Sequence, residues 1–507
     1  MQAPHAARSL RANVAANYAS LAFVMVAAIV AMPIFLRLLG VEAFGLVGFF
    51  TLLNAGFQVF DAGLSQTFAR ECARFSGGAR DLHSLRRLLA TFETAFFAVA
   101  AAGVVAIALG APMLASGWLR VEKIPLREVV IAIMLMGVAI PCQWVSGLYR
   151  GVLIGLERQV WLAAFNVAIA AARSFGVIGA LLLFGREPGV FFGYQACVAT
   201  VELIALVIIS HAVLRTSGVA PAAPLPWREF RDLLRFSSAV AFTAVAWLLL
   251  TQGDKLVLSK LLSLAGYGVF TLAAAAAGAV AALGAPIAQA ILPRLTRLNS
   301  AGDEAGAIAL YSRATQLTCL AALPAAMVLA CFARPVLWIW TGDAQVARQA
   351  APILAAYAVG GGLATLTAFP YYLQYSHGAL RLHVVGQALM LAALAPALIF
   401  AATRWGAVGT GVVWTLLNAT YILLWTPVVH ARFAPGLHGR WLWRDIAPVA
   451  AAAAACAGLL ALVLTWPHGR LEAAVELISV SASVLLAGLL ASSAGRAALR
   501  AALGVWR

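Results

Sequence analysis

Residues 14–36 read VAANYASLAFVMVAAIVAMPIFL, a run without a single charged side chain. A bilayer has a hydrocarbon core about 30 Å thick, and a helix needs about 20 apolar residues to cross it. Arg8 and Arg11 precede the run, and its apolar length exceeds that of a cleavable signal peptide. We therefore interpret this stretch as a retained first membrane-spanning helix.

The same signal recurs along the whole chain. Alternation of apolar and polar residues with a period of two, which would indicate a transmembrane barrel, is absent. The predicted fold class is therefore an all-α polytopic membrane protein with about 14 transmembrane helices. The expected spans lie near residues 14–36, 44–68, 89–110, 129–149, 160–184, 189–213, 236–262, 267–292, 314–333, 350–373, 383–402, 407–429, 446–466 and 475–494.

Composition excludes the other broad classes. Of the 507 residues, 63% are hydrophobic and 11% are charged, whereas a soluble protein keeps roughly a quarter of its residues charged. The net charge of +16 would suggest nucleic-acid binding in a soluble protein, but here most cations lie in short loops that meet lipid headgroups. The six cysteines form no CxxC motif, so we expect neither a disulfide framework nor a metal site.

The distribution of basic residues predicts the orientation. With the N-terminus in the cytoplasm, roughly two thirds of the 35 Lys and Arg residues fall on the cytoplasmic side. Both chain termini are then expected in the cytoplasm. The longest connection, residues 217–235, contains Pro221, Pro224 and Pro226 and is interpreted as a link between two halves. Because no connection can hold a soluble catalytic domain, we expect no enzyme activity, no catalytic residues, no metal and no cofactor.

A long internal repeat supports two halves. Residues 37–45, RLLGVEAFG, are matched 223 residues later by residues 260–268, KLLSLAGYG. The same offset relates further pairs of residues: Gln66 with Gln289, and Arg74 with Arg297. An offset of six helices preserves orientation, so the predicted repeat is parallel, with its pseudo-twofold axis along the membrane normal. We expect an N-terminal half at residues 1–215, a C-terminal half at 216–445 and an extra helix pair at 446–507.

Six ionisable residues lie within the predicted spans. Such groups are costly in hydrocarbon, so they normally face protein or a wet cavity. Arg173 lies mid-span, either as a cavity cation for an anionic substrate or as one member of a buried ion pair with Glu93 or Glu202. Asp254 and Lys255 can neutralise each other. The carboxylates Asp61, Glu93, Glu202 and Asp254 are candidates for carrying a coupling ion.

Motifs near the ends of the helices carry a resemblance to a known family. The first half offers Asn17, Pro33, Arg37-Leu-Leu-Gly40, Phe44-Gly45, Asp61-Ala-Gly63 and Arg70. The second half offers Asp254-Lys255, Gly266-Tyr267-Gly268, Leu292-Pro293-Arg294 and Leu337-Trp338-Ile-Trp340-Thr-Gly342. Over residues 10–430 the chain resembles the polysaccharide repeat-unit flippases (Wzx-like) of the multidrug/oligosaccharidyl-lipid/polysaccharide exporter superfamily.

The resemblance implies a function in cell-surface polysaccharide biosynthesis, for O-antigen or exopolysaccharide. Such a flippase moves an undecaprenyl-pyrophosphate-linked oligosaccharide from the cytoplasmic to the outer leaflet by alternating access. The expected partners are this lipid-linked oligosaccharide, membrane lipids and the polymerase or ligase of the pathway. By position alone, Arg37, Arg173, Lys255 and Arg294 are the candidates for contact with the pyrophosphate.

Several other functions remain open at this point. A lipid II flippase and a drug or cation antiporter of the same superfamily would share the two halves. A membrane polymerase, ligase or glycosyltransferase is less well supported, because this chain has no large outer loop and no carboxylate cluster beside a cytoplasmic domain. A non-transporting assembly scaffold would leave the repeat and the mid-span charges unexplained.

Overall fold

The protein is described by a computed structural model that covers residues 3–61, 63–79, 81–214, 245–246, 248–466 and 469–502. Within these ranges the regular elements are helices, and the β-type pairing is an isolated bridge between Arg120 and Ser263. Twelve helical stretches of the described residues are long and apolar enough to cross a membrane. The predicted class, an all-α polytopic membrane protein, is therefore confirmed, whereas the count of fourteen spans stays a prediction.

One of the twelve stretches, Arg381–Phe433, contains two of the predicted spans. Its 53 residues would extend about 80 Å as a straight helix, far more than one bilayer crossing requires. The helix is interrupted at Gly406, whose φ of 57° and ψ of −142° are not helical. A positive φ of this kind favours glycine, so the break lies where the sequence permits it. The predicted link, residues 217–235, lies outside the described residues, and so do residues 236–244 and 247 of the predicted seventh span, 236–262.

The chain packs into two compact units, Met1–Gly268 and Val269–Arg507. This division follows packing and does not test the predicted duplication, so the boundaries at residues 215 and 445 stay predictions. The first unit contains α1 (Ala3–Leu39), α2 (Val41–Phe57), α3 (Leu64–Ser76), α4 (Leu82–Met113), α5 (Leu126–Gly155), α6 (Gln159–Ala171), α7 (Val177–Phe184), α8 (Pro188–Val213), a helix over 248–261 and the start of α10 (Leu264–Ala282).

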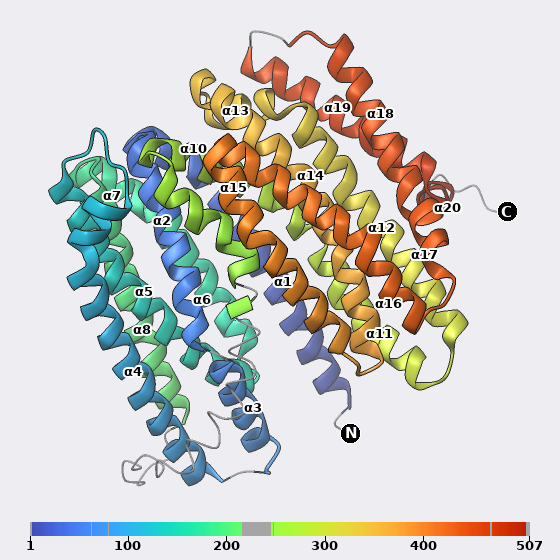
Figure 1. Ribbon diagram of the computed structural model, residues 1–507. Helices are drawn as coiled ribbons and strands as arrows, with labels where there is room; N and C mark the ends of the chain where they lie inside the picture. The colour runs from blue at the N-terminus through green and yellow to red at the C-terminus, as the bar shows by residue number, and fades with distance from the viewer. Residues whose placement is uncertain are drawn as a thin grey trace. The chain divides into compact units, whose positions relative to one another are not determined.

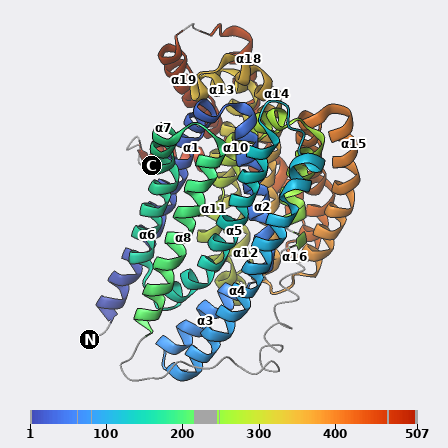
Figure 2. The ribbon, with the colours of Figure 1, turned by 90° about the vertical axis from the view of Figure 1, so that its left-hand side faces the viewer.

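Helix α5 forms the centre of the first unit. It runs beside α4 and α8, and the three helices are neighbours in both ribbon views (Figures 1 and 2). One face of α5 is fully buried, including Ile133, Ile140 and Leu148, so it packs against protein rather than lipid. By contrast, α4 exposes large apolar side chains such as Val105 and Leu109, which suit contact with hydrocarbon chains. Polar side chains on the buried face of α5 are thus shielded from lipid.

The N-terminus of α4 is capped by Asp81. Its side chain accepts a hydrogen bond from the Ser84 amide at 2.8 Å, which satisfies one of the free N–H groups of the first helical turn. This hydrogen bond lowers the pKa of the exposed Asp81 carboxyl from its ordinary value of 3.8. The cap therefore fixes where the helix begins, just after the polar stretch that ends α3.

The two copies of the repeat motif meet in a reciprocal contact. A Cβ added to Gly45 would lie 2.2 Å from the carbonyl oxygen of Leu264, and one added to Gly268 would lie 2.2 Å from that of Val41. Leu264 corresponds to Val41, and Gly268 to Gly45, at the offset of 223 residues found in the sequence. A contact in which each residue touches the counterpart of its partner is typical of a twofold relation. The glycines are needed here because the backbones approach too closely for any side chain.

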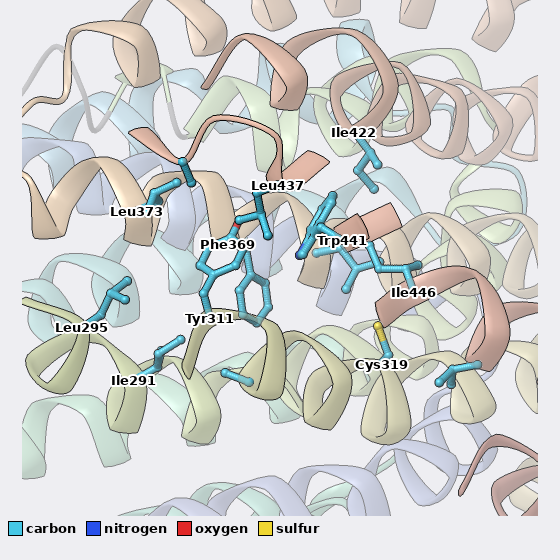
Figure 3. Close-up of a cluster of buried hydrophobic side chains, with 14 of the residues drawn as sticks. Ile291, Leu295, Tyr311, Cys319, Phe369, Leu373, Ile422, Leu437, Trp441 and Ile446 are labelled. Carbon is cyan, nitrogen blue, oxygen red and sulfur yellow. The ribbon is translucent and has the colours of Figure 1, made fainter. Parts of the chain in front are cut away.

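The second unit begins within α10 and continues with α11 (Ala285–Ser300), α12 (Glu304–Cys331), α13 (Ala333–Thr341), α14 (Ala344–Ser376), α15 (Arg381–Thr420), α16 (Thr426–Phe433), α17 (Leu437–Arg440), α18 (Ala447–Val463), α19 (Arg470–Ala491) and α20 (Ser493–Ala502). Its largest described core cluster joins α11, α12 and α14 to the segment before α18. Figure 3 shows Tyr311, Phe369 and Trp441 at the centre of this cluster. The Tyr311 and Phe369 rings meet edge to face at 5.5 Å.

Buried polar contacts tie the last helices to this core. Gln316 on α12 donates from Nε2 to Asp445 at 2.7 Å, and its Oε1 accepts from the Ser493 hydroxyl and the Ala494 amide, both at 2.9 Å. The side chain amide of one residue thus contacts segments on both sides of α18 and α19. Because buried polar groups are costly when unpaired, these bonds fix the predicted extra helix pair against α12.

Candidate functional site

Arg173 lies on a widened turn in the middle of a membrane span. Residues Ala172–Gly176 form a π-helical turn between α6 and α7, and turns of this type are frequent at functional sites. The Arg173 carbonyl accepts a hydrogen bond from Gln195 Nε2 at 3.1 Å, across from α8. At Gly176 a Cβ would lie 2.0 Å from the Tyr194 hydroxyl, so α8 packs closely against this turn. The fold therefore holds Arg173 firmly at membrane depth.

The side chain of Arg173 pairs with Glu202. Arg173 Nη2 lies 2.5 Å from Glu202 Oε2, and Arg150 Nη2 from α5 bonds the other carboxylate oxygen. Arg150 also donates from Nη1 to the Asn166 side chain oxygen of α6. One carboxylate is thus shared by two guanidinium groups that come from different helices. We call Arg150, Arg173 and Glu202 the arginine cluster.

The arginine cluster carries one net positive charge. The Glu202 side chain is only 3% exposed, while those of Arg150 and Arg173 are 29% and 22% exposed. The carboxylate is enclosed, and the two guanidinium groups reach the surface of the protein around it. The Nε atom of Arg173 is buried and has no hydrogen-bond partner among the described residues. Guanidinium has five N–H donors, so the cluster retains donors for an anion such as phosphate.

A second polar group lies nearby along α5. Glu93 of α4 accepts a hydrogen bond from the Tyr149 hydroxyl at 2.7 Å, and His211 Nε2 of α8 lies 2.8 Å from the same carboxylate oxygen. Tyr149 is fully buried, whereas His211 is 43% exposed in its side chain. Glu93 therefore bonds one buried side chain, Tyr149, and one partly exposed ionisable side chain, His211.

The structure brings together some predicted residues and separates others. It pairs Arg173 with Glu202 rather than with Glu93, which resolves the two partners that the sequence left open. Lys255 Nζ lies 3.4 Å from Asp254 Oδ1 and donates to the Thr251 carbonyl at 3.0 Å, which fits the predicted mutual neutralisation.

The remaining predicted residues lie on other elements of the structure. Asp61 accepts hydrogen bonds from the backbone and side chain of Ser65 and acts as a local cap before α3. Arg37 lies exposed in the last turn of α1. Arg294 lies exposed on α11 of the second unit. Contact of any of these residues with a substrate stays a prediction.

Sequence reasoning missed three members of these two groups. Arg150 directly follows the predicted span 129–149 and was therefore expected in a cytoplasmic loop. In the structure it lies inside α5 and turns towards Glu202. Tyr149 and His211 also lie at span ends, where such residues are common. A usable signal was the presence of Glu202 at mid-span, because a buried carboxylate requires cationic partners.

Within the described parts of the chain, no group of three or more His, Cys, Asp or Glu side chains could hold a metal ion. The polar groups of the first unit are instead arranged as ion pairs and hydrogen bonds.

Comparisons with known proteins identify the fold and the family. The chain is similar in structure to a lipid II flippase, MurJ, in an inward closed conformation, with a TM-score of 0.69. The similarity covers 94% of this chain and 97% of that one at 10% sequence identity, so it concerns the fold. No curated protein sequence matches the chain. Residues 10–299, more than half of the chain, match the family model described as polysaccharide biosynthesis protein.

This match agrees with the resemblance that the motifs near the helix ends indicate, and the structural similarity is to a flippase with the same helical architecture. The family match, which covers more than half of the chain, leads to one conclusion. The chain belongs to the polysaccharide biosynthesis protein family.

Proposed function

We propose that this protein moves an undecaprenyl-pyrophosphate-linked oligosaccharide repeat unit from the cytoplasmic to the outer leaflet of a bacterial inner membrane, for O-antigen or exopolysaccharide synthesis. The observation that carries the proposal is the arginine cluster, a net positive charge held at membrane depth in a chain of the polysaccharide biosynthesis family. The protein acts as a transporter and not as an enzyme, with both termini in the cytoplasm and the polymerase or ligase of the pathway as partners.

The physical problem in this reaction is the head of the substrate. Each sugar hydroxyl costs about 2–7 kcal/mol when it loses its hydrogen bonds to water, and the pyrophosphate adds negative charge. The polyprenyl tail is apolar and needs no protection from lipid. A protein that supplies hydrogen-bond donors and positive charge at membrane depth lowers the barrier for the head alone.

The arginine cluster can supply both. Guanidinium binds phosphate oxygens with two parallel N–H donors, and Arg173 has a buried Nε without a partner among the described residues. Glu202 bonds both guanidinium groups and offsets one of their two positive charges. Arg37, Lys255 and Arg294 are further candidates for contact with the pyrophosphate. The two predicted halves would then expose the site to one side of the membrane and afterwards to the other.

Glu93 is our candidate for the coupling group. Glu202 is committed to two ion pairs and Asp254 lies beside Lys255, whereas Glu93 is bonded to a hydroxyl and a histidine. Loss or gain of a proton at Glu93 would change its bonds to Tyr149 on α5 and His211 on α8. A proton could in this way alter the packing of the helices that also carry the arginine cluster.

Substitution of Arg173 tests the proposal directly. In cells that depend on this protein, Arg173→Ala should abolish surface polysaccharide and cause lipid-linked repeat units to accumulate on the cytoplasmic face, while protein levels stay normal. Arg173→Lys keeps the charge but not the paired donors, so it should retain part of the activity. Arg127→Ala, at the exposed start of α5, is the matched control and should leave the polymer unchanged. Normal polymer in Arg173→Ala cells would contradict the role of the cluster.

Lipid II is the second candidate substrate, favoured by the similarity in fold to a lipid II flippase. Deletion of the gene distinguishes the two substrates. Viable cells that lack a surface polysaccharide would support the repeat-unit substrate. Lysis, together with rescue of cells that lack their own lipid II flippase, would support lipid II.

A further inference from the structure

A large apolar groove lies within the first unit, apart from the arginine cluster. It has a volume of about 740 Å³ and lies between α2, α4 and the helix over 248–261. Its wall includes Phe49, Phe57 and Phe60 on the side of α2, and Leu249 and Leu256 on the opposite helix. Among its lining residues, Gln252 and the indole of Trp118 are the polar groups. We call this feature the α2–α4 groove.

The groove is open rather than enclosed. The Phe60 side chain is 57% exposed, and those of Leu256 and Leu249 are 43% and 38% exposed. All three walls belong to apolar helices, two of which are long enough to cross a membrane. The medium that meets these side chains in the membrane is therefore hydrocarbon. The groove is therefore open to hydrocarbon chains of the membrane.

One end of the groove is built for a charged group. Trp118, where the α4 span ends, donates from its indole nitrogen to the Ser259 hydroxyl at 3.0 Å. Lys260 Nζ lies 4.9 Å from the centre of the Trp118 ring, a cation–π contact. The exposed Arg120 lies two residues beyond Trp118, and its carbonyl accepts from the Leu264 amide at 2.8 Å. A tryptophan beside two cations at a span end is typical of the headgroup level of a membrane.

The acidic groups at this end do not cancel the two cations. The carboxylate of Glu42 is buried and bonds the backbone amides of Glu122 and Lys123. Glu122 is matched by the adjacent exposed Lys123. Lys260 and Arg120 therefore leave a net positive charge where the apolar groove meets the interface.

We propose that the α2–α4 groove binds a hydrocarbon chain of an anionic phospholipid, whose phosphate lies against Lys260 and Arg120. An amphiphile with an apolar chain and a negative head matches both the lining and the charged end. Phospholipid is the occupant because it is in large excess over any other amphiphile in the membrane, and occupancy follows concentration. The proposal does not depend on which substrate the protein transports.

The bound lipid joins three helices. Its chain fills the space between α2, α4 and the helix over 248–261, where protein side chains leave a gap. Apolar contacts with the chain replace contacts that the helices do not make with one another. The lipid thus acts as a packing element of the first unit.

Two glycines offer a matched pair of variants. Gly56 lines the groove, and a Cβ added there would meet no atom within 4 Å, so Gly56→Leu places an apolar side chain in the groove. Gly110 on α4 has the same free space but does not line the groove. Gly110→Leu therefore controls for the effect of adding leucine to a helix of this unit.

The test uses the purified full-length protein in detergent, titrated with phosphatidylglycerol that carries brominated chains. The signal is the quenching of Trp118 fluorescence by bromine. It is obtained by subtracting the quenching measured in the same protein with Trp118→Phe added. We expect saturable quenching in the wild type and Gly110→Leu, and its loss in Gly56→Leu. Brominated phosphatidylcholine should quench at least several-fold more weakly at equal concentration. Lys260→Gln should remove most of this preference.

Three results would overturn the proposal. Equal quenching in the wild type and Gly56→Leu would place the lipid outside the groove. Equal affinity for both headgroups would remove the role of Lys260 and Arg120. Displacement of the brominated lipid by an equimolar amount of polyprenyl phosphate would assign the groove to an isoprenoid chain instead.

Discussion

Glu93 is the residue at which one carboxylate oxygen joins α5 and α8. Its carboxylate oxygen is shared by Tyr149 and His211, which lie on two different helices. Glu93→Gln keeps the shape of the side chain but cannot carry a proton. If Glu93 is the coupling group, transport by this variant in proteoliposomes should no longer respond to an imposed pH gradient.

Tyr149→Phe is the control for this experiment, because it removes one hydrogen bond and leaves the carboxylate in place. It should slow transport without removing the pH response. A Glu93→Gln protein that still follows the gradient would assign the coupling to another group.

Glu202 holds together two cations that would otherwise repel each other. Glu202→Gln should lower the thermal midpoint of the purified protein, because loss of one partner of a buried pair costs about 3–5 kcal/mol. Adding Arg150→Gln to this variant should recover part of the midpoint, since only one buried cation then remains. A midpoint unchanged by Glu202→Gln would show that water already screens the cluster.

The sequence located the mid-span cation and carboxylate but not the complete cluster. Arg173 and Glu202 stand out because each interrupts an apolar run. Arg150 does not, because it lies at a span end, where arginine is common for reasons of orientation. Whether an arginine at a span end faces the headgroups or pairs with a buried carboxylate depends on the direction of its side chain around the helix. An error of a few residues in the predicted end of a span is enough to conceal that direction.

At the scale of elements, the reciprocal glycine contact makes a symmetric prediction. Gly45→Ala and Gly268→Ala each place a methyl group 2.2 Å from a carbonyl oxygen, and both should lower stability by about 1–3 kcal/mol. The effects should be similar, and transport should fall in both variants. Gly179→Ala in α7, where a Cβ meets nothing within 4 Å, is the control. Thermal midpoints measured side by side would show whether the two positions are equivalent.

The Asp81 cap predicts a local effect with a defined sign. Asp81→Ala should increase hydrogen exchange at the Ser84 amide at neutral pH, whereas Asp81→Asn, which can still accept, should change it little. Because the pKa of Asp81 is lowered from 3.8, the carboxylate cap persists through mildly acidic conditions. Its contribution is lost only as the pH falls through that lowered pKa. Equal exchange in the two variants would show that the cap does not hold the helix end.

Elements were easier to predict than their interruptions. Long apolar runs give helices because a chain in lipid must satisfy its backbone internally. The π-helical turn at Arg173 and the break at Gly406 depend on packing against neighbouring helices, which composition does not reveal. The repeat motif was visible in the sequence, but the close approach of its glycines was not.

At the scale of the whole molecule, the 53-residue stretch Arg381–Phe433 should cross the membrane twice. In a protein without native cysteines, Ala379→Cys before the first crossing should react with an impermeant maleimide from the cytoplasmic side. Thr403→Cys, just before the break at Gly406, should react from the opposite side. Labelling of both from one side would reject a double crossing and the predicted orientation together.

The overall class followed from the sequence because hydrophobicity alone dictates it. The boundaries near residues 215 and 445 stay predictions, because the compact units, which divide at Gly268, follow packing and not the duplication. A repeat shows how a sequence is related to itself, whereas a compact unit shows which helices pack together. The helix over 248–261 belongs to the predicted second half by the repeat and to the first unit by packing.

The crossing at Gly45 and Gly268 has a mechanical consequence. Where two helices interlock through large side chains, one cannot turn on the other until those side chains leave their grooves. Here each glycine meets a backbone carbonyl, and neither glycine has a side chain to withdraw. The first turns of α2 and α10 are therefore suited to serve as a fulcrum, about which the helix ends can swing while the point of contact stays fixed.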